Sequence, residues 1–203
     1  MRTVSYSMHV SLDGFMDSPG RGDGWSEPDE EVHRFANEQM AASSGSVYGR
    51  RLYEVMAGYW PNVPNDPDAS EIEQEFAAAW LATPRLVFSR TLSSVDWNSR
   101  LAAGDMATEV RQFHEETGGD IECGGADLAA QLIKLGLVDE FRLFVFPVIL
   151  GAGRPFFPLL DAAIKVEQVE TRRFDKSGVV YLRYRKVTQP LGWVGTSTRN
   201  QVT

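Results

Sequence analysis

Two arginines beside a glycine could bind a negatively charged ligand. Gly49 precedes Arg50 and Arg51 in the stretch VYGRRLYEVM, where a short strand pattern changes into a helix pattern. Cations at the N-terminus of a helix oppose its dipole, which costs about 0.3–1 kcal/mol for each exposed charge. A bound anion would reverse this effect, because backbone N–H and guanidinium groups would then point to one charge. The alternative is a solvated pair with an ion pair to Glu54, one turn further on.

Two further junctions carry a similar signal. Ser89 and Arg90 follow the strand pattern RLVF, and a hydroxyl beside a guanidinium suits either a phosphate or an ordinary polar turn. Gly124 and Gly125 separate a strand pattern from a helix pattern in IECGGADLAAQL. We expect the first glycine to allow the turn and the second to let a ligand or a neighbouring strand approach the backbone. The helix start behind them is a second potential anion site.

These junctions would serve one ligand only if they lie at one edge of a sheet. Open α/β sheets bind ligands at the carboxyl ends of their strands, so a ligand with several phosphates would satisfy all three junctions. No G-x-G-x-x-G follows the first strand pattern, and G-x-x-x-x-G-K-[ST] is absent from the chain. The sequence therefore has neither a Rossmann fingerprint nor a P-loop.

Metal and disulfide chemistry is not expected. Cys123 is the single cysteine, which excludes an internal disulfide and a metal site of several cysteines. The three histidines, His9, His33 and His114, have no i, i+4 spacing. We predict no metal site.

The elements that would position these residues follow from the apolar periodicity. Helices are expected from after Ser26 to about residue 41, over 50–60, after the caps Ser70 and Asp105, and after Gly125. The predicted strands are 4–12, 45–49, 85–89, 94–98, 120–123, 140–150, 164–174 and 178–187. Strands that alternate with helices and then a β-rich end predict one mixed α/β domain over 1–187. Residues 188–203 have weak patterning and are expected to be a C-terminal extension.

Composition and charge exclude several classes of partner. The chain has 203 residues, of which 43% are hydrophobic, so a packed core is expected. Its formal net charge of −8 argues against binding nucleic acid or an anionic membrane, which both favour excess Lys and Arg. No apolar run reaches the length of a membrane span, and the N-terminus lacks the apolar segment of a signal peptide. We therefore expect a cytoplasmic protein.

Five motifs in order resemble one family. They are SMHVSLDGF, VYGRRLYE, LVFSR, IECGGADLAAQLIKLGLVDE and FPVILGAGRPFF. Together they resemble the dihydrofolate-reductase-like family, and most closely its riboflavin-pathway reductase branch, the RibD C-terminal domain. The resemblance implies a mixed, mostly parallel sheet of about eight strands flanked by helices. It also implies NADPH as the cofactor and reduction of a pterin-like or pyrimidine-like ring.

The resemblance implies a cofactor site at the strand ends. Its residues are Met8, His9, Met16, Gly49, Arg50, Arg51, Ser89, Arg90, Cys123, Gly124, Gly125 and Ala126. The Gly49 junction would meet the phosphates, the Ser89 junction the adenosine 2′-phosphate, and the two glycines with Ala126 the pyrophosphate. Cys123 would lie near the nicotinamide, together with the backbone around Met8 and His9. Met16 would lie in the loop that closes over that ring.

A proton donor for the substrate is suggested by one spacing. Trp25, Pro28 and Glu30 form W-x-x-P-x-E, similar to the W-x-x-P-x-D/E of dihydrofolate reductases, whose acid helps to protonate the pterin. A partly buried Glu30 with a raised pKa could act in this way. Alternatively, Asp29, Glu30 and Glu31 complement the dipole of a helix N-terminus. We expect Glu30 to have at most a supporting role.

The other substrate residues are open to two interpretations. Tyr53 and Trp60 could line an aromatic pocket or belong to the core, and Arg154 could hold a substrate anion or a partner subunit. The riboflavin branch carries a DDPxL segment with contacts to a ribose-phosphate, whereas this chain has EVMAGYWPNVPNDPD. That difference, and the missing deaminase domain, weaken the case for the riboflavin intermediate as substrate.

The sequence as a whole predicts a cytoplasmic NADPH-dependent reductase, expected to be a homodimer. The substrate would be a pterin, a pyrimidine or a similar flat heteroaromatic ring, and the enzyme would be related to 5-amino-6-(5-phosphoribosylamino)uracil reductase. One alternative is a dihydrofolate reductase, which is favoured only if Glu30 faces the pocket. The other is an NADP-binding regulatory or interaction protein without turnover.

Overall fold

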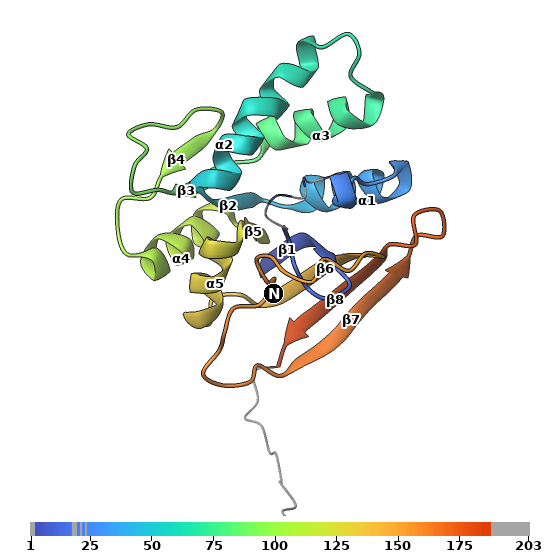
Figure 1. The fold of residues 1–203 in the computed structure, drawn as a ribbon. Helices are drawn as coiled ribbons and strands as arrows, with labels where there is room; N and C mark the ends of the chain where they lie inside the picture. Colours follow the sequence, from blue (N-terminus) through green and yellow to red (C-terminus); the bar gives the residue numbers. More distant parts are fainter. Residues whose placement is uncertain (1–2, 18–19, 21, 23, 188–203) are drawn as a thin grey trace, which may run out of the picture.

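The described residues form one eight-stranded sheet with helices on both faces (Figure 1). A computed structural model describes residues 3–17, 20, 22 and 24–187. The strands are β1 (Val4–Ser11), β2 (Gly45–Gly49), β3 (Arg85–Phe88), β4 (Ser99–Leu101), β5 (Ile121–Gly124), β6 (Glu140–Phe146), β7 (Val166–Arg173) and β8 (Val180–Lys186). The α-helices are α1 (Glu30–Ala42), α2 (Arg50–Tyr59), α3 (Glu71–Ala82), α4 (Met106–Thr117) and α5 (Ala126–Lys134), and the short 3-10 helices are η1 (Gly24–Ser26) and η2 (Trp60–Asn65).

The strand order confirms the predicted mixed, mostly parallel sheet. It runs β4-β3-β2-β5-β1-β6-β8-β7. The first six strands in this order pair in parallel, whereas β8 is antiparallel to β6 and to β7. The carboxyl ends of β1, β2, β3, β5 and β6 therefore meet at one edge, as the three junctions require.

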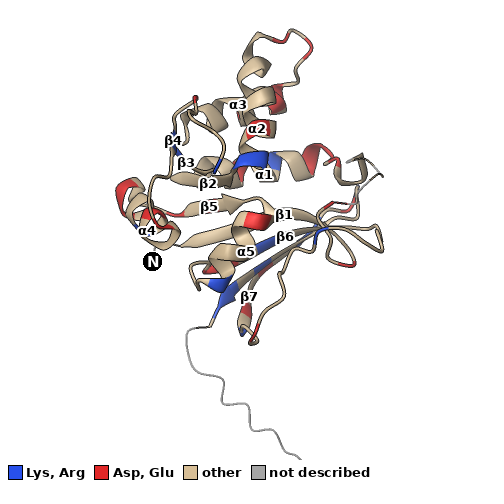
Figure 2. Cartoon of the chain, turned by 60° about the vertical axis from the view of Figure 1, so that its left-hand side comes forward, with Lys and Arg blue, Asp and Glu red and all other residues tan. Residues whose placement is uncertain are grey.

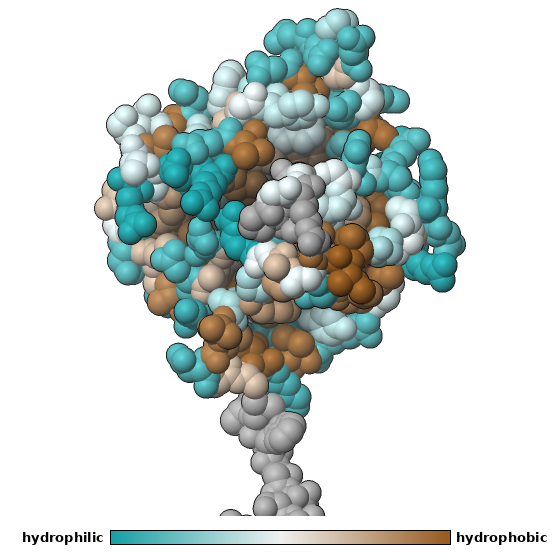
Figure 3. All heavy atoms as spheres, viewed as in Figure 1, coloured by the Kyte–Doolittle hydropathy of each residue, from teal (hydrophilic) through white to brown (hydrophobic). Residues whose placement is uncertain are grey.

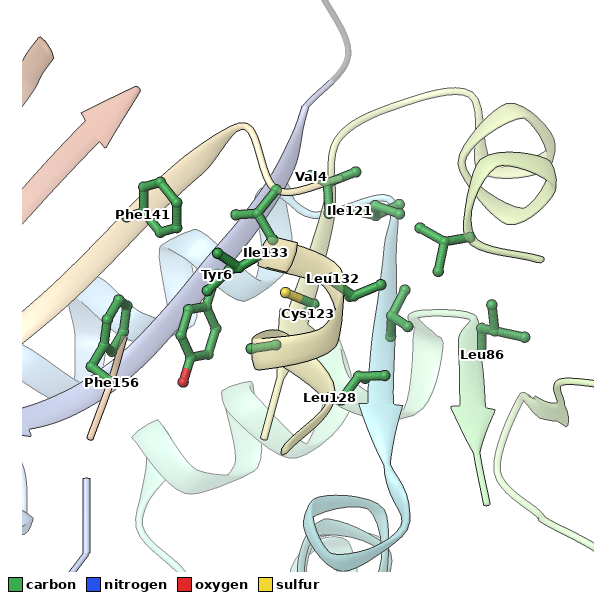
Figure 4. Packing of buried hydrophobic residues seen from close by; sticks show 14 of the residues in the cluster. Val4, Tyr6, Leu86, Ile121, Cys123, Leu128, Leu132, Ile133, Phe141 and Phe156 are labelled. Atoms are coloured by element: carbon green, nitrogen blue, oxygen red, sulfur yellow. The ribbon is translucent and has the colours of Figure 1, made fainter. Parts of the chain in front are cut away.

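Each face of the sheet is buried by its own set of helices. On one face, Phe113 of α4 and Leu132 of α5 pack with Val4 and Ile121 of the sheet (Figure 4). On the other face, Phe35 of α1 packs on the β6–β8 side, and Met40 of α1 packs with Trp80 of α3 on the β2 side. Full burial of one such side chain stabilises the fold by about 1.5–3 kcal/mol.

Three of the helices begin with a side-chain cap, and two do not. Asp29, Ser70 and Asp105 cap α1, α3 and α4, and Ser70 forms the predicted capping box with Glu73. The cap at Asp29 corrects the expected start of the first helix after Ser26. By contrast, α2 and α5 follow Gly49 and Gly125, which have no side chain that could accept a hydrogen bond.

Two predicted strands differ from the structure. The strand predicted at 94–98 is wrong, because Trp97 and Asn98 have left-handed φ values of 59° and 52°, and β4 begins one residue later. The strand predicted at 140–150 ends at Phe146, since Pro147 has no N–H group for a strand ladder. Residues 175–177 form a turn between β7 and β8, and Gly178 follows it with a φ of 73°. The predicted extension at 188–203 lies outside the described residues.

Candidate functional site

The starts of α2 and α5 adjoin at the carboxyl edge of the sheet. A Cβ atom built on Gly125 would lie 4.0 Å from the backbone nitrogen of Gly49 and 3.6 Å from Cβ of Leu52. Since neither helix start has a side-chain cap, their first N–H groups remain available to a ligand. We call this region, with Arg51, Asp127 and Arg154, the helix-start edge.

The two glycines of this edge have exchanged their expected roles. Gly125, the second glycine, takes the turn, with a φ of 95° that L-residues rarely adopt. Gly124 stays in the strand, where a Cβ atom would lie 2.4 Å from Cδ2 of Leu52. The prediction that the first glycine turns the chain is therefore wrong, because close packing against α2 requires that glycine to stay extended.

The arginines of the edge have weak partners. Arg50 pairs with Glu54 at 2.9 Å, which is the alternative that the sequence left open. Arg51 and Arg154 both approach Asp127, at 3.8 and 4.0 Å, and Arg154 also pairs with Asp17 at 2.6 Å. The exposed pairs of Arg50 and Arg51 contribute only about 0–1 kcal/mol, so an anionic ligand can displace them. Arg154 is held more firmly, because both its side chain and its backbone N–H bond to Asp17. Figure 2 shows this basic start of α2 directly after β2.

The Ser89 junction forms a polar turn at the end of β3. The Ser89 hydroxyl accepts hydrogen bonds from the backbone N–H groups of Thr91 and Leu92, at 3.1 and 2.9 Å. Arg90 is exposed and makes no ion pair with any residue that the structure describes. Its guanidinium is therefore available to an external anion.

A pocket of about 720 Å³ lies next to the helix-start edge, between the sheet and helices α1, α2 and α3. We call it the central pocket. The predicted residues that line it are Met8, His9, Met16, Trp60 and Gly124. Apolar side chains from both layers, such as Leu52, Met56, Phe76 and Phe144, form much of its wall. Such a pocket suits a flat apolar ring.

Cys123 does not line this pocket, contrary to the prediction. Its side chain is 0% exposed and packs on the α5 face of the sheet with Tyr6 and Leu128 (Figure 4). Burial raises the pKa of the thiol far above its ordinary value. The error is one of strand phase, because Glu122 and Gly124, on either side of it, are the residues that face the pocket.

Three predicted substrate or catalytic residues also lie elsewhere. The Glu30 side chain is 68% exposed and pairs with Arg34 at 3.1 Å, so it supports the start of α1. Tyr53 is buried in the core, where its hydroxyl bonds to the backbone of Asp96. Trp25 packs against Phe146, with ring centroids 6.0 Å apart, and is not part of the pocket wall.

Glu122 is a site residue that the sequence analysis missed. Its carboxyl group lines the central pocket, and it makes no hydrogen bond or ion pair with any described residue. Burial raises its pKa to about 7, although the charge of Arg142 opposes this shift. A signal was present in the sequence, since an acid between the apolar Ile121 and Cys123 at a strand end points away from the core.

Arg142 does not neutralise Glu122, because its guanidinium is engaged elsewhere. It contacts the buried Glu140 at 3.3 Å, and Arg183 and Arg185 bond to the same carboxylate at 2.8 Å. Burial alone would raise the pKa of Glu140, but these arginines lower it to about 2. Arg142 also donates a hydrogen bond of 3.2 Å to Oε1 of Gln39, which lies between it and the central pocket.

The two imidazoles of the pocket are neutral at physiological pH. Burial lowers the pKa of His9 to about 4, and its Nδ1 donates to the carbonyl of Ser26 at 3.1 Å. Burial also lowers the pKa of His33. By contrast, Glu73 stays ionised, because hydrogen bonds from Ser70 and Tyr59 lower its pKa to about 2. The described pocket wall thus contains carboxyl groups and neutral imidazoles, with no Lys or Arg.

Other classes of site are not found in the described part of the chain. No group of three or more His, Cys, Asp or Glu side chains there could hold a metal ion. No helix in the same part is both long and apolar enough to cross a membrane.

Comparison with known sequences gives one family. The family model of the RibD C-terminal domain matches residues 2–180. YyaP, an uncharacterised protein of Bacillus subtilis strain 168, is 34% identical over 186 residues, which cover 90% of this chain and 94% of that protein. YwjB of the same organism is 35% identical over 74 residues, or 36% of this chain and 41% of that protein.

Comparison with solved structures gives the same fold. A Shewanella sp. PV-4 protein assigned to riboflavin biosynthesis has a TM-score of 0.70 at 18% identity, over 91% of this chain and 99% of that one. RibD of Acinetobacter baumannii has a TM-score of 0.66 at 16% identity, over 92% of this chain and 58% of that one. At such identities the likeness shows the fold, which confirms the predicted architecture.

Proposed function

Because the chain belongs to the RibD C-terminal domain family, we propose that it is a cytoplasmic NADPH-dependent reductase of a flat nitrogen heterocycle. The ring would be of the pterin or pyrimidine type. A solved structure of similar fold, from Thermotoga maritima, is a deaminase joined to a 5-amino-6-(5-phosphoribosylamino)uracil reductase, and this chain covers 57% of it. That relationship supports the reductase chemistry, and the shape and lining of the pocket support the substrate class.

One observation carries the proposal. Two helix starts without side-chain caps adjoin at the carboxyl edge of the sheet, and a pocket with an apolar wall opens beside them. Backbone N–H groups at such helix starts bind phosphates, and the pocket suits the flat rings of a cofactor and its substrate. A polyanion with a ring at one end fits both regions at once.

The residues of the site fit NADPH. Because Gly125 has no side chain, a pyrophosphate could approach the start of α5, where it would accept from backbone N–H groups and from Arg51 and Arg154. Arg90 and Arg50 would meet the 2′-phosphate. Met8, His9 and Met16 would form the wall for the nicotinamide.

The chemistry divides between the cofactor and the protein. NADPH supplies a hydride when it is bound. Burial raises the pKa of the Glu122 carboxyl group to about 7, so this group can carry a proton near neutral pH. Glu122 is the pocket residue best suited to give a proton to the ring, after which the ionised carboxylate would accept hydrogen bonds from the N–H groups of the ring. The neutral His9 and the apolar wall would exclude water from the ring.

We further propose that the protein acts as a homodimer. Exposed large hydrophobic side chains motivate this proposal, because a surface on which such side chains gather into one patch marks a protein interface. They include Leu12, Ile149, Phe157 and Leu159. Hydrophobic residues reach the surface in several separate patches (Figure 3). Light scattering on the eluting peak of a size-exclusion column would test the oligomeric state.

Two measurements test the reductase function. Titration calorimetry with NADPH and NADH measures cofactor binding, and loss of the near-ultraviolet absorbance of NADPH measures turnover with a panel of pterins, pyrimidines and flavin precursors. We expect tight NADPH binding and turnover of at least one ring. Tight binding without turnover would favour an NADP-binding regulatory or interaction protein. Binding of neither cofactor would remove the reductase proposal.

A further inference from the structure

The charges of the central pocket differ from those of a phosphate site. Its described wall includes Glu27, Glu73 and Glu122, contains no Lys or Arg, and has only neutral imidazoles. A phosphate placed among these groups would lose its hydration without gaining a cationic partner, which is strongly unfavourable. Arginines that could serve a phosphate, such as Arg51 and Arg154, lie at the helix-start edge instead.

Glu122 lines the pocket and has no hydrogen-bond or ion-pair partner among the described residues. Glu122 lies in β5 between β1 and β2, opposite Ser5 and Ser46 in the strand register. A carboxyl group in this position is unfavourable in the free protein, as its raised pKa shows. A ligand that donates hydrogen bonds to both carboxylate oxygens would remove this cost.

A second polar group beside the pocket has a fixed orientation. Oε1 of Gln39 accepts from the buried Arg142, so the amide Nε2 is the part of the side chain left to donate to a ligand. Glu122 can therefore accept hydrogen bonds from a ligand, and Gln39 can donate one. Together they match the edge of a ring that carries an amino group, a neighbouring N–H and a carbonyl oxygen.

We propose that the central pocket selects a nitrogen heterocycle that carries no phosphate group, and that Glu122 and Gln39 bind the amidine and carbonyl edge of this ring. The inference rests on the proposed reductase function and makes its substrate more specific. A phosphoribosyl-bearing pyrimidine, which the Thermotoga maritima relative is named for, is therefore not the substrate here. Pterins and 2-aminopyrimidinones without a phosphate have the required edge.

The sharpest test compares one ring with and without a phosphate. Calorimetry would measure the binding of 6-hydroxymethylpterin, of its phosphate monoester, and of 2-aminopyrimidin-4-one to the NADPH complex. We expect the free pterin to bind at least about tenfold more tightly than its ester, because the ester must place an anion among carboxylates. Equal or tighter binding of the ester would overturn the proposal.

Variants then test the residues. Glu122→Gln keeps the size of the side chain and removes the acceptor pair, so pterin binding should weaken about tenfold or more. Glu38→Gln, on the exposed side of α1, is the matched control and should bind as the wild type does. Unchanged binding by Glu122→Gln would refute the role of Glu122.

Two outcomes distinguish a failure of this substrate class from a failure of the proposed reductase function. If NADPH binds but neither unphosphorylated ring does, the substrate class proposed here is wrong and the cofactor site stands. If NADPH itself does not bind, the reductase function fails. Melting curves followed by circular dichroism would confirm that each variant is folded.

Discussion

The helix-start edge and the central pocket adjoin at Gly124 and Gly125, yet they differ in charge and in the kind of group they present. The helix-start edge offers backbone N–H groups and exposed arginines, and its partners are weakly held carboxylates. The central pocket offers the carboxyl group of Glu122, which has no partner among the described residues, and two imidazoles whose neutral form burial favours. Under the proposed function, one edge of the sheet would hold a polyanion through backbone N–H groups and a neutral ring through side chains, without a cation in common.

The largest expected effect is on the turnover rate and comes from a change in the central pocket. Glu122→Gln should lower the turnover rate about 10²–10⁴-fold, because a general acid is lost, and should leave NADPH affinity unchanged. Steady-state kinetics with the ring found in the substrate panel would measure it, with Glu38→Gln as the control. A near wild-type rate would show that the proton comes from elsewhere, such as water.

The next largest effect is on the choice between NADPH and NADH and comes from arginines at the strand ends. Arg50→Ala combined with Arg90→Ala should reduce the preference for NADPH over NADH about 10²-fold, because two charge-assisted hydrogen bonds to the 2′-phosphate are lost. High salt should erode the same preference, since part of it is Coulombic. Equal losses for both cofactors would mean that these arginines do not contact the 2′-phosphate.

A smaller effect tests whether the two regions are independent. Arg51→Ala combined with Arg154→Ala should weaken NADPH and NADH binding alike, about tenfold, because both share the pyrophosphate. Binding of 6-hydroxymethylpterin to the free protein should not change. If the pterin also loses affinity, the helix-start edge contributes to the ring site and the division proposed here is too sharp.

The smallest effect concerns the free energy of unfolding. Glu122 has a folded pKa of about 7, above its ordinary value of 4.5, so the folded state binds more protons between these values. Its contribution to stability therefore falls as the pH rises from about 4.5 to about 7. Because solvent can reach the pocket, it screens part of this unfavourable contribution. We therefore expect Glu122→Gln to stabilise the protein by about 1 kcal/mol at about pH 8 and not at about pH 4. Urea unfolding at both pH values would measure the difference.

Motif order and helix caps made the fold predictable from the sequence. The alternation of strands and helices and the caps at Ser70 and Asp105 are local features, and the structure confirms them. The strand predicted at 94–98 failed because local β-propensity does not reveal the left-handed φ of Trp97 and Asn98. Features that depend on contacts between several elements could not be predicted from such local signals.

The candidate site was predictable only in part, for the same reason. Met8, Met16 and Trp60 were expected at the site, and they line the pocket. Cys123 was assigned to the wrong face and Glu122 was missed, although the acid between the apolar Ile121 and Cys123 indicates the phase of this four-residue strand. That phase follows from the pairing of Cys123 with Tyr6 in β1, which places both residues on the α5 face.

The contact between Gln39 and Arg142 also bears on how the substrate range of this protein could evolve. Arg142 is largely buried, its Nε has no hydrogen-bond partner among the described residues, and Gln39 covers it on the pocket side. A shorter residue at position 39 would expose the guanidinium group of Arg142 to the pocket. Its contact with Glu140 already holds this group in place. Under the substrate class proposed above, one codon change could therefore turn a pocket that disfavours phosphate into one that accepts it, so substrate classes could diverge while the backbone stays the same.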